Sequence, residues 1–499
     1  MRFNKLTLLC FIFLIGMMAL FYNYIEIFNK RPQATHTWRQ TDGAALARNY
    51  FQNGLDFFSP QLQSVEYNEG HTVAELPVVY YLSAISYKLF GFKEGYFRLV
   101  NFFIFLLGLT GFFYTSAHII KSKFWGAILA SLLFACPVIA YYAFNFLPDS
   151  TALGFMLLGF TFMYDWHEKK TTRSLLFFIL FTAIAGAIKI TSLYFPLSFV
   201  GAIFLTSSFK KDNKDLLKLV FSFVSILGFS LIWLFWSMHY KALHHSEYFL
   251  QSPVTFSFSK IVHGYSWKDI FNILVKNSFS VFYSIPLLTM IGLSSVLIFK
   301  LVRHVSKFDL VFLVLNTIGA FSVLMLFYFQ YSVHDYYAVI WVVTGILWIV
   351  YLAKYLRLFY NKNTYRLASV CLLLLWGLSI VSAKNVLDFR YNNLSLDNNL
   401  PLELHSIEPF LIKLNIPKEG LFITPDDFTS NASLYFLNRK GYTGYFLASS
   451  WDRYEMAMQK NMRYLACWNV GREHYEYESK LKPVLIGTYG KVRIYKLTY

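Results

Sequence analysis

Long apolar runs dominate this 499-residue chain and limit what it can fold into. They recur along most of its length, and most are close to the roughly 20 residues that a helix needs to cross a bilayer. In addition, 15% of the residues are charged, whereas soluble proteins carry about 25%. The sequence therefore predicts a polytopic α-helical membrane protein.

We expect about eleven membrane-spanning helices from these runs. They cover approximately residues 6–25, 99–120, 124–144, 150–166, 174–189, 191–208, 218–238, 279–300, 309–329, 337–353 and 367–383. The apolar stretch Pro77–Phe90 is shorter, about 14 residues, which is more typical of an interfacial or re-entrant segment than of a span. Whether it spans decides on which side of the membrane every later loop lies.

Lysine and arginine residues assign the sides. If Pro77–Phe90 does not span, the basic clusters between the runs, such as Lys210–Lys218 and Lys354–Arg366, all fall on one side. The short loops of the opposite side, Asn145–Asp149 and Gln330–Asp335, contain no Lys or Arg. The positive-inside rule therefore places the N-terminus in the cytoplasm and the C-terminus outside. The net charge of +17 then reflects loops that face membrane lipids, and no nucleic-acid partner is indicated.

The chain after Ala383 is more polar and predicts a separate domain. Residues 420–427 and 484–495 are typical of short strands, and residues 433–439 and 453–459 of helices. We expect a transmembrane domain over 1–383, with a first outer loop over about 26–98, and a small extracytoplasmic α/β domain over 384–499. Four scattered cysteines without a CxxC pair indicate neither a disulfide framework nor a thiolate zinc site. Sparse cysteine and Lys/Asn-rich loops fit a bacterial inner (plasma) membrane with the tail in the periplasm, although an endoplasmic-reticulum membrane obeys the same physics.

Polar and aromatic residues gather at the start of the first outer loop, in His36-Thr37-Trp38-Arg39-Gln40-Thr41-Asp42, and a helical stretch, Gly43–Phe51, follows. A carboxylate at Asp42, just outside the bilayer, is suited to accept a proton from an acceptor hydroxyl or amine as a general base. The alternative interpretation of Asp42 is a helix N-cap or an ordinary loop acid.

Two further acids lie in outer loops. Glu75 precedes Pro77 and the pair Tyr80-Tyr81, and it is suited to bind a divalent cation or a sugar hydroxyl. It is equally suited to be a first-turn acid that the helix dipole favours. Asp149 has the sequence context of an N-cap, but the expected topology puts it on the same side as Asp42, which makes it a catalytic candidate.

Basic and aromatic residues complete the set of candidates. Lys189 is the lone basic residue between Leu175 and Ser208, and either a lipid phosphate or snorkelling to the headgroups would stabilise its charge. The outer loop His334-Asp335-Tyr336-Tyr337 combines hydrogen-bonding groups with rings on which a sugar can stack, although interfacial belts also contain tyrosine. Four histidines of the neighbouring loop lack the spacing of a metal site; they are His239, His244, His245 and His263.

The order of these motifs resembles the GT-C membrane glycosyltransferases. It is most similar to glycosyltransferase family 39, with protein O-mannosyltransferases and lipid A aminoarabinose transferases as relatives. The motifs that carry the resemblance are the acid-bearing first loop, Glu75-x-Pro77-x-x-Tyr80-Tyr81, Leu89-Phe90-Gly91, Phe97-Arg98-Leu99, Ile188-Lys189-Ile190-Thr191 and His334-Asp335-Tyr336-Tyr337. Together they cover most of residues 1–350.

The resemblance implies a polyprenyl- or dolichyl-phosphate-linked sugar donor, an outer-face reaction with inversion, and a lipid, glycan or protein acceptor. It implies Asp42 as general base, Glu75 as an acid that can hold a divalent metal ion, and Asp149 as the second-loop acid. It also implies Lys189 near the donor phosphate. The expected substrate-binding residues are His36, Arg39, Tyr81, Lys189, His334, Asp335, Tyr336 and Tyr337.

The chain departs from both named relatives at two positions. It has Asp42-Gly43 where O-mannosyltransferases tend to have Asp-Glu, and Glu75-Leu76-Pro77-Val78 where aminoarabinose transferases tend to have Glu-Lys-Pro-Pro. Neither specific acceptor is therefore transferred to this chain. The alternative functions are a transporter or flippase, an assembly protein for lipid-linked glycans, and an O-antigen ligase or polymerase. A transporter would predict inverted repeats and broken helices, and a ligase would predict a late Arg- and His-rich loop.

Overall fold

The computed structural model describes residues 4–66, 68–73, 75–206, 213–246, 271–272, 275–327, 330–331, 334–359, 362–393, 400–447, 451–469 and 481–498. The chain divides into two compact units. The helical unit comprises Met1–Phe28, Arg98–Phe235 and Ser252–Phe389. The loop–tail unit comprises Asn29–Phe97, Trp236–Gln251 and Arg390–Tyr499, so that the first outer loop and the C-terminal tail pack as one body.

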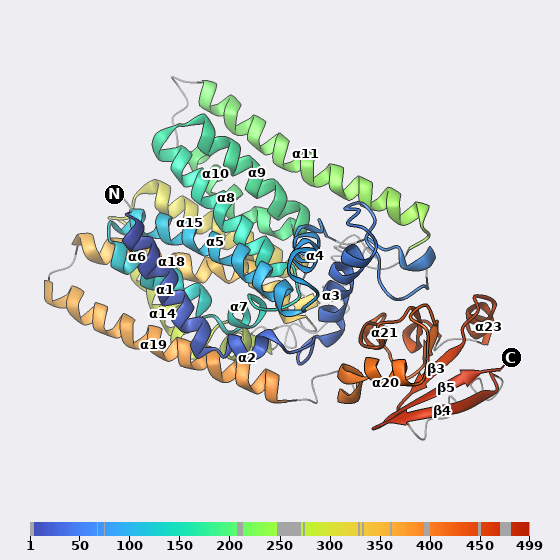
Figure 1. Ribbon diagram of the computed structural model, residues 1–499. Coiled ribbons are helices and arrows are strands. Elements are labelled where there is room, and N and C mark those ends of the chain that lie inside the picture. Colours follow the sequence, from blue (N-terminus) through green and yellow to red (C-terminus); the bar gives the residue numbers. More distant parts are fainter. Residues whose placement is uncertain are drawn as a thin grey trace. The chain divides into compact units, whose positions relative to one another are not determined.

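The helical unit is a bundle of helices (Figure 1). Its helices, some of which end in the other unit, are α1 (Lys5–Phe21), α2 (Tyr24–Phe28), α5 (Gly95–Ile120), α6 (Lys123–Phe134), α7 (Pro137–Tyr142), α8 (Asp149–Lys169), α9 (Thr172–Ile188), α10 (Tyr194–Thr206), α11 (Asn213–Leu243), α14 (Ile285–Lys300), α15 (Lys307–Leu326), α17 (Ala338–Trp341), α18 (Val343–Phe359) and α19 (Lys362–Asn392). Glycines allow a close crossing of α5 and α8: a Cβ on Gly108 of α5 would lie 2.3 Å from the carbonyl oxygen of Gly154 on α8. Small residues at such crossings are typical of membrane bundles.

Membrane-length helices are present, as expected. Among the described residues, five helices are long and apolar enough to cross a membrane, or six if the bent pair Val275–Phe282 and Ile285–Lys300 is one span. Further apolar helices, such as α1 and α9, have 10–17 residues and are shorter than the 18 residues required of a span here. The mostly helical, polytopic fold is therefore confirmed, whereas the number of about eleven spans stays a prediction.

Two of the expected helices are broken. The helix expected over 124–144 ends at Phe134, and a new helix, α7, begins at Pro137. Proline fits the first position of a helix, where the missing N–H would have no intrahelical partner. The helix expected over 279–300 is interrupted before Ile285, with a bend of 117°. There Ser284 is extended, and a proline stands in the first turn of α14.

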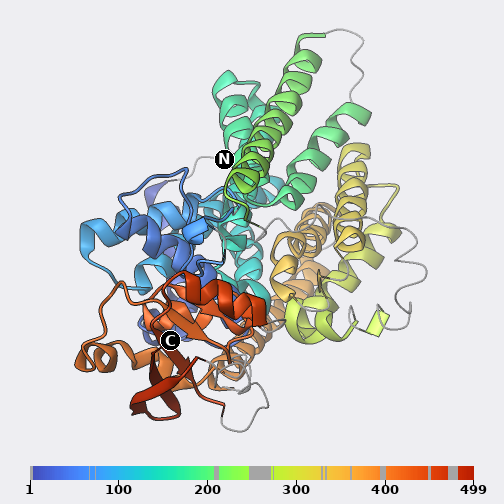
Figure 2. The same cartoon turned by 90° about the vertical axis from the view of Figure 1, so that its right-hand side faces the viewer.

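The loop–tail unit combines two helices of the first outer loop with a five-stranded sheet from the tail. The helices are α3 (Thr37–Gln52) and α4 (Val78–Phe90), and the strands are β1 (Phe422–Thr424), β2 (Gly441–Thr443), β3 (Tyr464–Cys467), β4 (Pro483–Tyr489) and β5 (Val492–Leu497). The strand order is β2-β1-β3-β5-β4, with β1 parallel to its two neighbours and β5 antiparallel to its own. The sheet belongs to the orange-to-red part of the chain in Figure 2. Short helices accompany the sheet: α20 (Glu408–Lys413), α21 (Ala432–Leu437), α22 (Gly444–Leu447) and α23 (Trp451–Gln459).

The first outer loop extends this sheet at its β2 edge. Ser64 forms a parallel bridge with Gly441, and the backbone N–H of Val65 donates to the Gly441 carbonyl at 2.9 Å. The Asn431 side-chain oxygen accepts from the backbone N–H groups of Gln63 and Ser64, at 3.0 and 3.2 Å. Val65 itself belongs to the apolar core of the tail. The loop is thus held by the tail through both backbone pairing and burial.

Candidate functional site

Helix α3 carries the first group of candidates. It begins directly after His36, whose backbone is left-handed (φ 60°) and whose carbonyl accepts from the N–H groups of Arg39 and Gln40. The Gln40 side chain donates to the carbonyls of Gln33 and Thr35, at 2.6 and 2.9 Å, and so fixes the chain that enters the helix. The helix therefore starts six residues before the expected Gly43, and it includes Asp42 rather than following it.

Arg39 and Asp42 lie three residues apart, on one face of α3. The Asp42 side chain is fully buried, and Arg39 is 4% exposed. The Arg39 guanidinium pairs with the Glu75 carboxylate at 2.5 Å, and the hydroxyl of Tyr80 donates to the other Glu75 oxygen at 3.3 Å. Residues from the two conspicuous segments of the first loop thus meet, with the acid of the second segment bound to the arginine of the first.

Tyr81 faces another part of the same loop. Its hydroxyl donates to the Leu55 carbonyl at 2.9 Å, and its ring packs edge-on against Tyr50 and Phe57. Tyr80, which we did not select, is the tyrosine that contacts Glu75. Adjacent tyrosines on a helix point in different directions, and the sequence does not indicate which of the two faces the acid.

The helical unit contains a second group, built around Lys189. This residue ends α9, and its ammonium lies 3.3 Å from the carboxylate of Asp149 in the first turn of α8. The same ammonium lies over the rings of Tyr336 and Tyr337, at 5.6 and 5.0 Å from their centroids. Three separately predicted segments thus form one cluster, in which the cation is held by a carboxylate and by aromatic faces.

Tyr142 joins this cluster although the sequence analysis missed it. Its hydroxyl donates to the Asp335 carboxylate at 2.5 Å, and its ring packs edge-on against Tyr336. The ring of His334 stacks on Tyr336, with the centroids 5.4 Å apart. Tyr142 lies in a long apolar run, where its sequence context is that of a core tyrosine.

Two polar residues near the start of α5 organise the loop that leads to Asp149. The side-chain amide of Asn101 donates to the carbonyls of Tyr142, Asn145 and Leu147, at 3.3, 3.0 and 2.9 Å. The buried guanidinium of Arg98 donates to the Phe144 carbonyl at 3.0 Å. Their signal in the sequence is two polar residues that open an apolar run, a pattern that equally fits an interfacial helix end.

The residues that the structure describes do not by themselves form a metal site. Among the residues that the structure describes, no group of three or more His, Cys, Asp and Glu side chains is placed to hold an ion. The Glu75 carboxylate, our candidate ligand, is paired with Arg39. His71 and His244 stack at 4.3 Å, and burial, followed by the charge of His244, lowers the pKa of His71. His263 lies outside the described residues.

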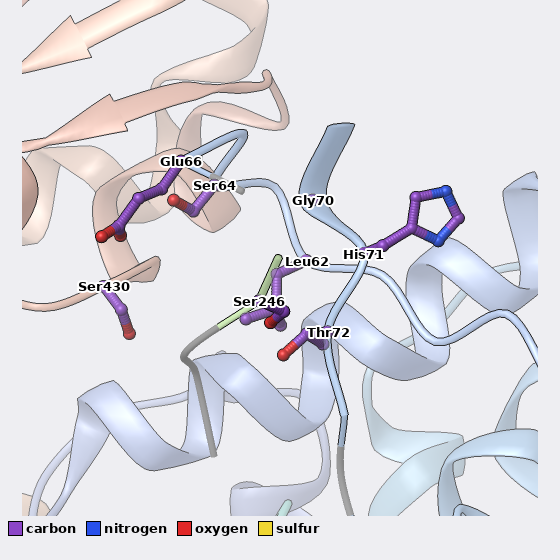
Figure 3. A pocket seen from close by; sticks show the side chains of 8 residues that line it. All are labelled: Leu62, Ser64, Glu66, Gly70, His71, Thr72, Ser246 and Ser430. Carbon is purple, nitrogen blue, oxygen red and sulfur yellow. The ribbon is translucent and has the colours of Figure 1, made fainter. Parts of the chain in front are cut away.

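A small recess lies beside the extended strand of the first loop (Figure 3). Ser64, Thr72 and Ser246 contribute buried hydroxyls to it, and the Gly70 backbone lines it. Its volume of about 10 Å³ is room for one water molecule, which three hydroxyls can bind. We assign it no larger ligand.

The two groups of candidates belong to different units. His36, Arg39, Asp42, Glu75 and Tyr81 are in the loop–tail unit, whereas Asp149, Lys189, His334, Asp335, Tyr336 and Tyr337 are in the helical unit.

Comparisons with known proteins identify the fold. Residues 72–233 match the family model for dolichyl-phosphate-mannose-protein mannosyltransferase. Two structures of ArnT from Cupriavidus metallidurans, apo and bound to undecaprenyl phosphate, align with TM-scores of 0.56 and 0.58. Both are 13% identical to this chain in sequence, and both alignments cover 97% of it. The alignments cover 98% of the apo ArnT chain and 97% of the ArnT chain bound to undecaprenyl phosphate.

Two other solved structures are also similar. The Archaeoglobus fulgidus oligosaccharyltransferase, in complex with Zn and sulfate, has a TM-score of 0.56 and 13% identity over 91% of this chain and 67% of its own. The arabinofuranosyltransferase AftD from Mycobacteria has a TM-score of 0.50 and 10% identity over 100% of this chain and 40% of its own. No curated protein sequence matches the chain. The chain therefore has the GT-C glycosyltransferase fold, as its resemblance to that group predicted.

Proposed function

We propose that this protein is a membrane glycosyltransferase, which transfers a sugar from a polyprenyl-phosphate-linked donor to a lipid, glycan or protein acceptor. The observation that carries the proposal is the buried carboxylate of Asp42, on the helix that also bears the Arg39–Glu75 ion pair, in a chain with the GT-C fold. Burying a carboxylate is unfavourable, and such groups concentrate at functional sites. We place the reaction at the outer face of a bacterial inner membrane, with the N-terminus in the cytoplasm and the tail outside.

In the proposed reaction, Asp42 accepts the proton of the acceptor's hydroxyl or amine while that oxygen or nitrogen bonds to the anomeric carbon. The bond between the anomeric carbon and the phosphate oxygen breaks, and the lipid phosphate leaves with the electron pair. A single displacement of this kind inverts the anomeric centre. It requires one base and stabilisation of the leaving phosphate, and no second carboxylate acts as a nucleophile.

We assign the leaving phosphate to Lys189. Its ammonium has three donors, so that it can bind a phosphate oxygen while it keeps its contact with Asp149. Tyr336 and Tyr337, over which the ammonium lies, offer faces for the donor's sugar. Asp149 then acts by positioning the lysine. His334 and Asp335 complete the donor side through their contacts with Tyr336 and Tyr142.

On the acceptor side, Glu75 holds Arg39 in place, and Arg39 is the second candidate for a phosphate contact. The Archaeoglobus relative was crystallised with Zn, but the donor set around Glu75 does not by itself fit a metal. The proposed steps therefore use the chain's own cations. His36 and Tyr81 shape the entry to α3 and the loop beside it.

The test is a transfer assay in membranes with radiolabelled polyprenyl-phosphate sugars. It compares wild type, Asp42→Asn and the control Asp56→Asn, which removes another carboxylate of the same loop that accepts from the backbone of Phe58. We expect wild type and Asp56→Asn to consume donor, and Asp42→Asn to fold and bind donor without turnover. Full activity of Asp42→Asn would refute the general-base assignment.

A flippase for lipid-linked glycans is the second candidate function. The 117° bend before Ile285 favours it, because broken helices are typical of transporters. No turnover of any donor by folded wild-type protein, together with movement of labelled lipid across vesicles, would support this alternative.

A further inference from the structure

A second pocket of the loop–tail unit is large enough for a sugar. It encloses about 440 Å³, within the range of about 300–1,000 Å³ that ligand pockets occupy. The first outer loop contributes the carboxamides of Asn49, Asn53 and Gln63, and the tail contributes the cations Lys418, Arg439 and Lys440. One acid, Glu419, also lines it. The lining thus combines uncharged hydrogen-bonding groups with an excess of positive charge.

The carboxamides form a partly satisfied network. Asn49 donates to the Gln61 carbonyl at 2.7 Å and accepts from the Gln63 amide at 3.3 Å. Gln63 is 3% exposed, and its side-chain oxygen has no hydrogen-bond partner among the residues that the structure describes. A buried acceptor without a partner is unfavourable. A ligand hydroxyl in the pocket would donate to this oxygen.

The buried cation of the pocket is Arg439, which is 4% exposed. Its guanidinium donates to backbone carbonyls, those of Leu437 and Asn438 at 3.5 and 3.0 Å and that of Ile416 at 3.2 Å. It pairs with no carboxylate, and its Nε has no acceptor, within the described part of the chain. The charges of Glu408 and Glu419 act on it from a distance, so that no ion pair within the described residues neutralises it directly.

Lys440 and Lys418 extend the positive charge to the rim. The Lys440 ammonium donates to the Glu69 carbonyl at 3.3 Å, and burial lowers its pKa. Lys418 is exposed. Because a lysine ammonium has three donors, Lys440 retains donors for a ligand. Charge-assisted hydrogen bonds to phosphate or carboxylate are stronger than those between neutral groups.

The pocket shares a helix face with the proposed base. Asn49 follows Asp42 by seven residues, which is about two turns of α3 and an axial distance of roughly 10 Å on the same side. Asn53 continues that face by one more turn. A saccharide that filled the pocket would therefore extend along α3 toward Asp42.

We propose that this pocket binds an anionic saccharide, a sugar that carries a phosphate or a carboxylate, as part of the acceptor. The carboxamides take the sugar hydroxyls, and Arg439 with Lys440 takes the acidic group. The role of the saccharide as acceptor rests on the proposed function, but its binding in the pocket does not. An experiment can therefore refute the binding proposal and the transfer proposal independently of each other.

The test measures binding to the full-length protein in nanodiscs by calorimetry, with four probes: glucose 6-phosphate, glucuronate, glucose and inorganic phosphate. We expect the two anionic sugars to bind at least about 10-fold more tightly than glucose or inorganic phosphate, since a hydrogen bond to a charged group contributes about that factor. Equal binding of glucose and glucose 6-phosphate would overturn the proposal. Inorganic phosphate that binds as well as glucose 6-phosphate would show an anion site without sugar recognition and would also overturn it.

Two variants and a control locate the binding. Lys440→Gln should weaken the anionic sugars about 10-fold, and Gln63→Leu should weaken all three sugars alike without affecting inorganic phosphate. Lys413→Gln removes an exposed lysine of the same tail that does not line the pocket, and it should change nothing. Equal effects of Lys440→Gln and Lys413→Gln would place the binding elsewhere and refute the pocket. Asp42→Asn should bind the four probes as wild type does. A variant that binds the probes but does not transfer sugar would therefore test the proposed function and leave the binding proposal unaffected.

Discussion

The two units bury opposite members of their ion pairs. In the helical unit the side chain of Asp149 is 1% exposed and that of Lys189 is 13% exposed. In the loop–tail unit the side chain of Arg39 is 5% exposed and that of Glu75 is 15% exposed. In each pair one member is nearer to solvent, Lys189 in the helical unit and Glu75 in the loop–tail unit. At these two pairs, the helical unit therefore leaves the positive charge nearer to solvent, which suits a phosphate, and the loop–tail unit leaves the carboxylate nearer to solvent.

The largest effect should come from the buried acid of the loop–tail unit. Asp42→Asn keeps the side chain's shape but removes its basicity, so we expect turnover to fall by about 10²–10⁴-fold, the usual contribution of a positioned base. The donor KM should remain within a factor of about three, because in this division the donor phosphate belongs to the other unit. Steady-state transfer kinetics with one radiolabelled donor measure both parameters. If Asp42→Asn lowered donor affinity instead of turnover, the assignment of the donor to the helical unit and of the base to the loop–tail unit would be wrong.

The next effect should come from the cation of the ion pair in the helical unit. Lys189→Met removes the ammonium but keeps an apolar stem, and we expect the donor KM to rise by about 10–100-fold, since a hydrogen bond to a charged group is worth about 1.5–3 kcal/mol. The matched control is Lys169→Met, which removes another lysine paired with an aspartate, Asp165, in the same unit. Donor titration against both variants gives the comparison. Equal donor KM values for the two variants would mean that Lys189 only forms a structural ion pair with Asp149 and does not bind the donor.

The sequence indicates candidate residues in both groups, but it does not indicate their partners. Asp42, Glu75 and Lys189 were recognisable because a charged side chain beside a long apolar run is conspicuous. Their pairings were not, because Arg39 lies 36 residues before Glu75, and the Lys189–Asp149 pair joins two helices. Spacing within one helix predicts only neighbours three or four residues apart.

The tail shows the same limit for strands. The segment expected as a strand over 420–427 contains β1, and the segment over 484–495 overlaps β4 and β5. The strands β2 and β3 were not expected; three or four residues are too few to display an alternating pattern, and β1, which is equally short, was expected only within a longer strand-like segment. The bridge of Ser64 to Gly441 could not be expected either, because it joins residues hundreds of positions apart whose pairing is set by the fold.

A smaller effect should come from the contact that holds α3 to the tail. Glu94 pairs with Arg31 and Arg48 at 3.1 and 3.4 Å, and it accepts from the hydroxyl of Tyr435 at 2.6 Å. Tyr435→Phe removes that donor, and we expect the free energy of unfolding of the loop–tail unit to fall by about 1.5 kcal/mol. Hydrogen exchange of residues 37–52 measures the loosening of α3, and Tyr445→Phe, an exposed tyrosine of the same tail, is the control. Faster exchange in both variants alike would remove Tyr435 from this anchoring role.

The smallest effect should be a pH dependence of the loop–tail unit that the helical unit does not share. Burial, followed by the charge of Arg31, lowers the pKa of His405 from 6.5 to about 4, and its ring stacks on Phe436. Between pH 6.5 and 4 the unfolded chain binds a proton at this histidine that the folded unit does not, so stability is complete above that window and decreases as the pH falls through it. From pH 7.5 to 5.5 the loss should be about 1 kcal/mol. His405→Gln should remove this dependence, whereas His304→Gln, in the helical unit, should retain it. Hydrogen exchange at the two pH values, measured for β1 and for α8, separates the units, and an equal loss of protection in both would show that acid acts on the whole molecule and not through His405.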